Sequence, residues 1–198
     1  MARRPATLVR TGRRVAGFDV ELARLYARAR ALYPEGFPAE ETTTLEKLYH
    51  EVSYAFVAAL RREVAAQLAI APQVMPLDLF QIYGCGPIAL HDDRFRFPGV
   101  YFVIVVAHSG RLGVVDRRGR AARHAPGEIL LLDPYRKHAL VPEGRTAREH
   151  PYERTHSLVT AEEDQFVFLD FDVERRRLRE RFRNSPPPAA VDSWADQA

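Results

Sequence analysis

His91 and Asp93 stand two residues apart in the apolar stretch "IYGCGPIALHDDRF", residues 82–95. Side chains at positions i and i+2 of a β-strand point to the same face, so this imidazole and this carboxylate would project together while Asp92 points away. They would supply two of the three ligands of a facial iron site, which leaves positions on Fe(II) open for oxygen and a co-substrate. A second histidine from elsewhere is needed to complete such a site.

His138 is the candidate for this third ligand. It follows His91 by 47 residues, in "APGEILLLDPYRKHALVPEGR", where it opens an apolar strand after a Pro-Gly turn, another apolar strand and a short loop. In a jelly roll this connectivity can bring the second strand beside the first. The remaining histidines lack such a pairing and are interpreted as surface or helix residues: His50, His108, His124, His150 and His156.

Short β-rich runs separated by turns begin at residue 75 and predict the elements that position these side chains. The runs read "LDLFQIYG", "GVYFVIVVA", "RLGVVDRRG", "GEILLLDP", "HALVP" and "QFVFLDFDV". Their β-branched and aromatic content, and the short polar connections between most of them, favour an antiparallel sandwich or barrel over alternating strand–helix units. We expect residues 75–173 to form a mainly β, double-stranded β-helix (jelly-roll) catalytic core.

An N-terminal helical extension, residues 1–74, is predicted to pack on this core. Apolar residues recur at near-helical spacing over 18–33, and a second helix is expected over 45–68 with Thr44 as a candidate N-cap. We expect the two helices to flank the sheet, with a homodimer interface as the alternative role. The arginine-rich residues 1–18 are interpreted as a flexible basic lead-in.

Residues 174–198 are predicted to form a basic helix followed by a disordered tail. "ERRRLRERFRN" carries Leu178 and Phe182 four residues apart, and "SPPPAAVDSWADQA" is rich in proline and small residues. Arginine outnumbers lysine 27 to 2, yet the net charge is only +3. Because the arginines are spread along the chain rather than gathered in one patch, nucleic acid is not an expected partner.

Composition sets further limits. A chain of 198 residues suits one domain with its own hydrophobic core. The single cysteine, Cys85, excludes an internal disulfide and a multi-cysteine zinc site, and it fits a reducing compartment, so we expect a cytoplasmic location. No run approaches the roughly 18 apolar residues that span a bilayer, so we expect no membrane association.

The order of these motifs resembles that of the 2-oxoglutarate and Fe(II)-dependent dioxygenases, particularly their prolyl-hydroxylase-like branch. In that family a tyrosine-bearing strand leads to His-x-Asp, and then come an apolar strand, a Pro-Gly turn and a His followed by Pro, Gly and Arg. The resemblance spans about half of the chain, residues 78–172. Its motifs are "YGCGPIALHDD" (83–93), "GVYFVIVVA" (99–107), "APGEILLLDP" (125–134) and "HALVPEGR" (138–145).

The resemblance implies a metal centre and an activity. Iron would be bound by His91, Asp93 and His138. Tyr83 would hydrogen-bond a carboxylate of 2-oxoglutarate, which a phenol can do without adding charge. The implied function is an Fe(II)- and 2-oxoglutarate-dependent oxygenase that hydroxylates a C–H bond of a small molecule or a peptide side chain, with the metal and co-substrate carrying the chemistry.

The chain departs from the family pattern after the second histidine. The family usually has an Arg or Lys about ten residues further on, at the start of the last strand, which pairs with the distal carboxylate of 2-oxoglutarate. Arg148 has that spacing within a polar segment, and Arg154 and Arg145 are the alternatives. The loops at 94–99 and 144–154 would line the mouth of the site, and their arginines favour an anionic substrate.

Two other interpretations stay open. A cupin-type metal enzyme without 2-oxoglutarate has the same architecture, but cupins usually present His-x-His followed by a glutamate, and here Asp93 takes the second position. A metal-free jelly-roll module could instead bind a partner through its basic C-terminal helix, although a charged run of this kind is usually a solvated helix face.

Overall fold

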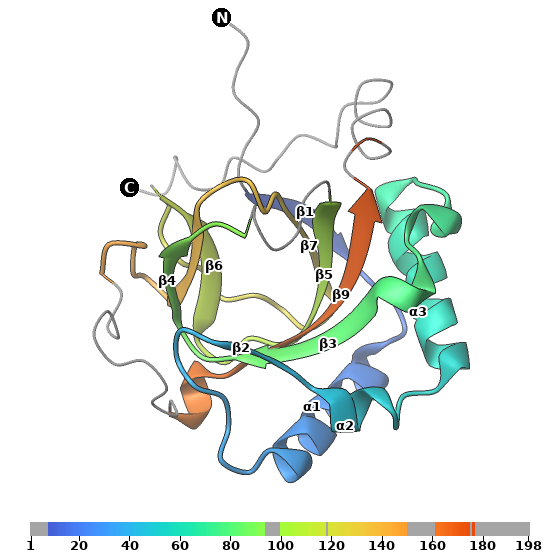
Figure 1. Ribbon diagram of the computed structural model, residues 1–198, viewed down its shortest axis with the longest axis horizontal. Coiled ribbons are helices and arrows are strands. Elements are labelled where there is room, and N and C mark those ends of the chain that lie inside the picture. Colours follow the sequence, from blue (N-terminus) through green and yellow to red (C-terminus); the bar gives the residue numbers. More distant parts are fainter. Residues whose placement is uncertain (1–7, 94–99, 118, 150–160, 175, 177–198) are drawn as a thin grey trace, which may run out of the picture.

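Two antiparallel β-sheets form the centre of the molecule (Figure 1). The computed structural model describes residues 8–93, 100–117, 119–149, 161–174 and 176. The six-stranded sheet has the order β1-β7-β5-β9-β3-β2, with β1 (Leu8–Arg14), β7 (Glu128–Leu132), β5 (Val100–His108), β9 (Phe166–Glu174), β3 (Phe80–Cys85) and β2 (Thr42–Thr44). The three-stranded sheet has the order β4-β8-β6, with β4 (Ile88–His91), β8 (His138–Pro142) and β6 (Leu112–Asp116). A mainly β fold with antiparallel pairing is therefore confirmed.

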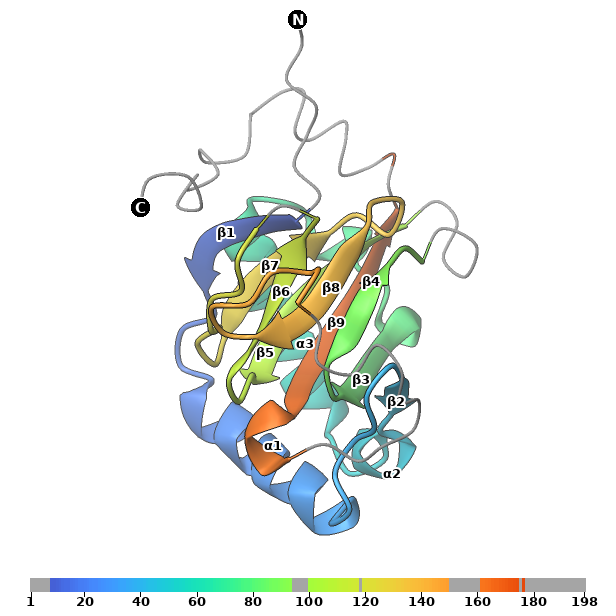
Figure 2. The same ribbon diagram turned by 90° about the vertical axis from the view of Figure 1, so that its left-hand side faces the viewer.

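Both faces of the six-stranded sheet are covered. The helices α1 (Asp19–Leu32) and α3 (Tyr54–Leu68), with the short α2 (Glu46–Tyr49), lie on one face, and the three-stranded sheet lies on the other (Figures 1 and 2). Single-turn 3-10 helices are Pro72–Val74, Leu77–Leu79 and Glu162–Asp164. In the part of the chain that the structure describes, no helix is both long and apolar enough to cross a bilayer.

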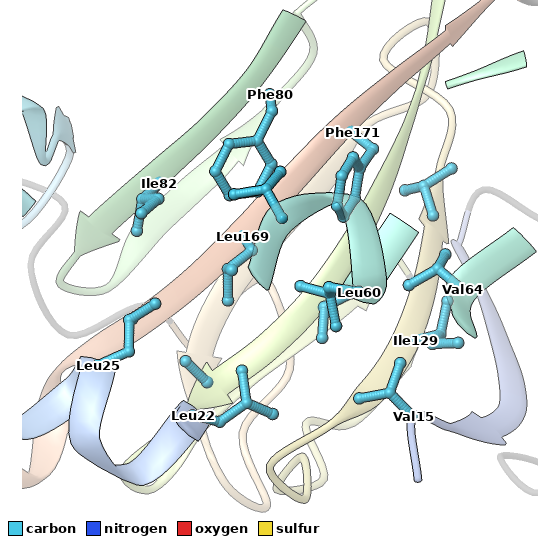
Figure 3. Packing of buried hydrophobic residues seen from close by; sticks show 14 of the residues in the cluster. Val15, Leu22, Leu25, Leu60, Val64, Phe80, Ile82, Ile129, Leu169 and Phe171 are labelled. Carbon is cyan, nitrogen blue, oxygen red and sulfur yellow. The ribbon is translucent and has the colours of Figure 1, made fainter. Parts of the chain in front are cut away.

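The first hydrophobic core lies between the helices and the six-stranded sheet (Figure 3). Leu22 of α1 and Leu60 and Val64 of α3 pack in one cluster with Leu169 and Phe171 of β9, and all five are completely buried. Each such side chain contributes about 1.5–3 kcal/mol by leaving water. Apolar burial therefore holds α1 and α3 on this face.

A second core lies between the two sheets, and alternate residues of the central strands contribute to the two cores. On β5, Val103 and Val105 belong to the helix side, whereas Phe102 and Ile104 belong to the inter-sheet side. This is the period of two that an extended backbone imposes. Because each face of β5 is buried, its sequence is an almost continuous apolar run rather than an alternation.

The N-terminal part of the chain differs from the prediction in its helices. The expected helix over 45–68 is interrupted, and α3 starts after Ser53, whose hydroxyl accepts the Phe56 N–H at 3.1 Å. Thr44 is not an N-cap, because it ends β2 and pairs with Tyr83 of β3. Three consecutive β-branched threonines favour an extended edge strand over a helix start.

The predicted basic lead-in also contains an ordered element. β1 pairs antiparallel with β7 and forms an edge of the six-stranded sheet, so the expectation of a flexible segment was wrong for residues 8–14. Charged side chains are common on edge strands because they discourage pairing with other chains. Beyond β9, only Arg176 is described, so the predicted basic helix and tail lie outside the described residues.

Candidate metal centre

His91 and His138 are brought together by the three-stranded sheet. His91 ends β4, His138 begins β8, and the ladder pairs the two residues directly. Their imidazole centroids are 4.3 Å apart, with 61° between the ring planes. The pairing of strands that are remote in sequence thus places two nitrogen ligands side by side.

Asp93 approaches both imidazoles from the segment that follows β4. Its backbone N–H donates to the Pro134 carbonyl at 2.9 Å, which ties this segment to the end of β7. Its Oδ2 lies 3.5 Å from Nε2 of His91 and 3.3 Å from Nε2 of His138. One ligand atom from each of the three residues lies within 4.8 Å of the other two, and we call this group the triad.

Backbone carbonyls fix the orientation of both imidazoles. Nδ1 of His91 donates to the Ala89 carbonyl at 2.8 Å, and Nδ1 of His138 donates to the Arg136 carbonyl at 3.0 Å. With the proton on Nδ1, the Nε2 lone pair of each neutral ring points toward Asp93. Three electron-rich atoms then converge, and they repel one another unless a proton or a metal cation lies among them.

The charges at the triad favour a bound cation. Burial raises the pKa of Asp93, but its hydrogen bonds with His138 and His91 outweigh that effect, so its pKa lies well below the usual range. Burial lowers the pKa of His91, while its hydrogen bonds to Asp93 and the Ala89 carbonyl and the negative charges of Asp93 and Glu40 raise it, with a net upward shift. The carboxylate is therefore ionised whenever a metal could bind.

Glu40 holds the strand that carries His91. Its two carboxylate oxygens accept the Ala89 N–H at 2.9 and 3.1 Å, and the carbonyl of Ala89 accepts the His91 imidazole N–H. Such supporting contacts orient metal ligands and raise their basicity. The sequence offers no local signal for Glu40, because it lies in a loop far from the His-x-Asp motif.

A cavity of about 170 Å³ opens between the two sheets next to the triad. Apart from the triad, its walls are hydroxyl, aromatic, aliphatic and thiol groups and one further carboxylate. No lysine or arginine lines it among the residues that the structure describes. The polar and aromatic members of the wall are Thr42, Thr44, Tyr83, Cys85, Phe102, Phe166, Phe168 and Asp170.

Tyr83 lines the cavity beside the triad. It is half-buried on β3, pairs with Thr44 of β2 and Phe168 of β9, and has its ring centroid 5.3 Å from that of Phe168. Its side chain shares the cavity with the triad. Thr44, which the sequence analysis took for a helix cap, adds a second hydroxyl to the same wall.

Two of the three predicted carboxylate-binding arginines, Arg145 and Arg148, are not brought to the triad. β8 ends at Pro142, and in the segment that follows Arg145 and Arg148 are exposed and do not line the cavity. The assignment of Arg148 assumed that the last strand begins near it, but that strand is β9, which begins at Phe166. Arg154 and the loop at 94–99 lie outside the described residues.

Asp170 was missed by the sequence analysis. It lies on the inter-sheet face of β9, is only 6% exposed and lines the cavity. A signal was present in "QFVFLDFDV", where Asp170 and Asp172 occur two residues apart in an otherwise apolar strand and must share one face.

The interpretation of the other histidines as surface or helix residues was wrong for His124, which is buried, and for His108, which is half-buried at the end of β5. His124 is buried, not at the surface: its Nε2 accepts the Val114 N–H at 3.1 Å and its Nδ1 lies 3.3 Å from a carboxylate oxygen of Glu128. These partners lie on β6 and β7, so His124 is a structural residue that contacts both sheets. His108 is half-buried and stacks on Tyr26 with centroids 3.7 Å apart. His50 is exposed, and residues 150 and 156 lie outside the described ranges.

Comparisons with known proteins give little further information. No protein-family model matches the chain, and no curated protein matches it. Among solved structures, the crystal structure of EvdO2 from Micromonospora carbonacea var. aurantiaca is similar to this chain, with a TM-score of 0.47 and 16% sequence identity. The likeness covers 81% of this chain and 84% of the EvdO2 chain. At this distance it assigns no function.

Proposed function

We propose that this protein is an Fe(II)-dependent oxygenase that hydroxylates a C–H bond of a small molecule or a peptide side chain. The observation that carries the proposal is the convergence of His91, Asp93 and His138 on one point. Two imidazoles and one carboxylate suit Fe(II), and a three-residue set leaves coordination positions for oxygen and a second molecule. Bound iron would supply the activation of oxygen, as cofactors generally carry the hard chemistry.

The residues present fit a divalent ion. Both imidazoles are held in the tautomer that offers Nε2, and the carboxylate between them has a lowered pKa. His138 is buried and His91 is half-buried, so the centre is sheltered from water on one side and open to the cavity on the other. The chain thus positions the ligands, excludes bulk water and leaves room for a substrate.

We further propose that the two sheets form a jelly roll. The order of the chain supports this: from β3 to β9 each successive strand lies in the other sheet, β3, β5, β7 and β9 in the large one and β4, β6 and β8 in the small one. A double-stranded β-helix has this alternation. It also explains how β4 and β8, whose histidines are 47 residues apart in the sequence, become neighbours.

As the co-substrate we propose 2-oxoglutarate. The motif order supports it, as do the hydroxyl groups of Tyr83 and Thr44 in the cavity wall, which can donate hydrogen bonds to a carboxylate. The buried Cys85 in the same wall, whose pKa burial raises to about 12, is an inert thiol and not a competing nucleophile. A reducing cytoplasmic location remains part of this proposal.

A metal enzyme that does not use 2-oxoglutarate is the second candidate. One observation favours it: no described lysine or arginine lines the cavity, and Asp170 adds a carboxylate there, which would repel a dicarboxylate. A metal-free binding module is the third candidate, and it requires that the triad bind no metal at all.

Anaerobic titration with Fe(II), with and without 2-oxoglutarate, separates the three candidates. We expect iron to bind the wild type, 2-oxoglutarate to produce a weak visible charge-transfer band, and His91→Ala to abolish both, while the exposed His50→Ala serves as a matched control. Iron binding without any effect of 2-oxoglutarate favours the second candidate. Absence of iron binding overturns the proposal and leaves the binding module.

A further inference from the structure

Asp170 is a buried carboxylate without a full set of partners. It lies on β9 with its side chain between the two sheets, is 6% exposed, and has no hydrogen-bond partner for Oδ1 among the described residues. The Phe171 N–H is the one donor that acts on its carboxylate charge. Buried polar groups in native proteins nearly always have partners, and an unmet one costs about 1–3 kcal/mol.

Its surroundings disfavour the free ionised state. Burial raises the pKa of Asp170 well above its usual value, and the nearby charge of Asp172 raises it further. Burial also raises the pKa of Asp172, to about 6. A carboxylate in such a place destabilises the free protein, so a molecule that enters the cavity is its natural partner.

The rest of the cavity suits a positive ligand. Phe102, Phe166, Phe168 and Tyr83 border it together with Asp170, and no lysine or arginine is among the described lining residues. Aromatic faces attract organic cations through their quadrupole, and more strongly when water is excluded. The centroids of Phe166 and Phe168 are 5.6 Å apart, so neighbouring rings form one wall.

The strand registers place Asp170 nearer to the triad end than Phe166 and Phe168 of the same strand, and nearer than Tyr83, which pairs with Phe168. Phe102 pairs with Asp172 and so lies one step farther toward that end. Asp170 pairs with Ile104 of β5, which in turn pairs with Leu130 of β7. β9 and β7 are both antiparallel to β5 and so run in the same direction, toward Pro134, whose carbonyl holds the Asp93 segment. Asp170 therefore lies between the Phe166–Phe168 rings and the triad end of the cavity.

We infer that the cavity binds its substrate as an organic ammonium ion, with the nitrogen at Asp170 and the alkyl portion against the aromatic wall. As an assignment of substrate class, the inference rests on the proposed oxygenase function. A cavity of about 170 Å³ matches a compact group, since an engineered cavity of about 150 Å³ binds benzene. This replaces the anionic substrate that the loop arginines suggested.

Three probes of similar length and different charge test the inference: n-pentylammonium, 1-pentanol and pentanoate, titrated into the full chain by calorimetry. We expect n-pentylammonium to bind at least tenfold more tightly than 1-pentanol, and pentanoate to bind most weakly. Asp170→Asn should remove that preference while 1-pentanol binding stays the same. Asp172→Asn is the matched control, because Asp172 shares the strand face but does not line the cavity, and its effect should be smaller. Phe168→Leu should weaken the binding of n-pentylammonium more than the binding of 1-pentanol.

Mn(II) binding, measured on the same samples by electron paramagnetic resonance, separates this inference from the proposed function. If Mn(II) binds but the three probes bind equally, or Asp170→Asn leaves the preference unchanged, the inference is wrong and the metal centre stands. If the ammonium probe binds through Asp170 but Mn(II) does not bind, the cation site stands and the oxygenase is wrong.

Discussion

His91 and His138 face each other directly across the β4–β8 ladder, as the last residue of one strand and the first residue of the other. Each donates its Nδ1 proton to the carbonyl two residues before it. The same local geometry is therefore used twice, and both Nε2 atoms are directed to Asp93. This shared arrangement is the basis of the first predictions.

His138→Ala should lower the affinity for Mn(II) or Fe(II) by more than about 100-fold, because even the loss of a supporting contact to a ligand costs about 10- to 100-fold. Anaerobic metal titration measures the change. His50→Ala should bind metal as the wild type does. Equal affinities of wild type and His138→Ala would show that the triad is not the metal site.

Metal affinity should fall as the pH falls. The pKa of His91 is raised above its usual 6.5, so the metal-free site keeps a proton on this ring to a higher pH than a free histidine does. Metal must displace that proton, and below the raised pKa each pH unit should weaken binding about tenfold. Asp93 adds no dependence near neutrality because its pKa is lowered. Mn(II) titrations between about pH 5.5 and pH 8 at constant ionic strength measure how the affinity changes with pH. This interval brackets the usual histidine pKa of about 6.5. A flat profile contradicts the prediction.

Glu40→Ala should weaken metal binding by about 10-fold without removing it, because Glu40 holds the Ala89 peptide that orients His91. Glu40→Gln keeps one acceptor oxygen and should restore most of the affinity. Comparing both variants by metal titration separates positioning from charge. If Glu40→Gln binds metal as weakly as Glu40→Ala does, the negative charge of Glu40 acting on His91 is the more important contribution.

Asp170→Asn should stabilise the metal-free protein by about 1–3 kcal/mol at pH 8 and by less at pH 4. The pKa of Asp170 is raised in the folded state, so the folded protein binds more protons than the unfolded chain does, and stability falls as the pH rises from about 3.9 through the folded pKa. Urea unfolding at the two pH values measures the difference. Asp172→Asn should raise the free energy of unfolding by a smaller amount, since Asp172 is less buried than Asp170. If Asp170→Asn is less stable than the wild type at pH 8, the conclusion that Oδ1 of the Asp170 carboxylate lacks a hydrogen-bond partner among the described residues is wrong.

Gly84→Ala should destabilise the fold by about 1–3 kcal/mol, because a Cβ at Gly84 would lie 2.4 Å from Cζ of Phe37. The ring has no freedom to retreat: Phe37 is completely buried, and its backbone N–H donates to Gln165 Oε1 at 2.6 Å. Gly119→Ala is the control, since its nearest contact is 3.4 Å, and it should change stability by less than about 0.5 kcal/mol. Thermal and urea unfolding of both variants check the prediction.

Local sequence pattern predicted most of the strands but not the N-terminal details. Apolar runs with β-branched and aromatic residues marked β3 and β5 to β9, since a strand with buried faces must carry such residues. They did not separate β4 from β3, which lie in different sheets. The pattern did not reveal β1 or β2, because edge strands bury less and can be charged or polar. It also missed the break between α2 and α3, which depends on the Ser53 cap and on how each helix packs.

The sequence by itself determined that His91 and Asp93 would be close, because they are only two residues apart. The expectation that both lie on one strand was wrong, since β4 ends at His91 and the Asp93 segment is held by Pro134. It also supplied Tyr83 and His138 as candidates for the same site. Only the tertiary structure decided that His138 lies beside His91, that Arg145 and Arg148 stay in solvent, and that Asp170 faces the cavity. The reason is physical: neighbours within a strand follow from backbone geometry, whereas neighbours across strands follow from register and sheet packing, which depend on the whole chain.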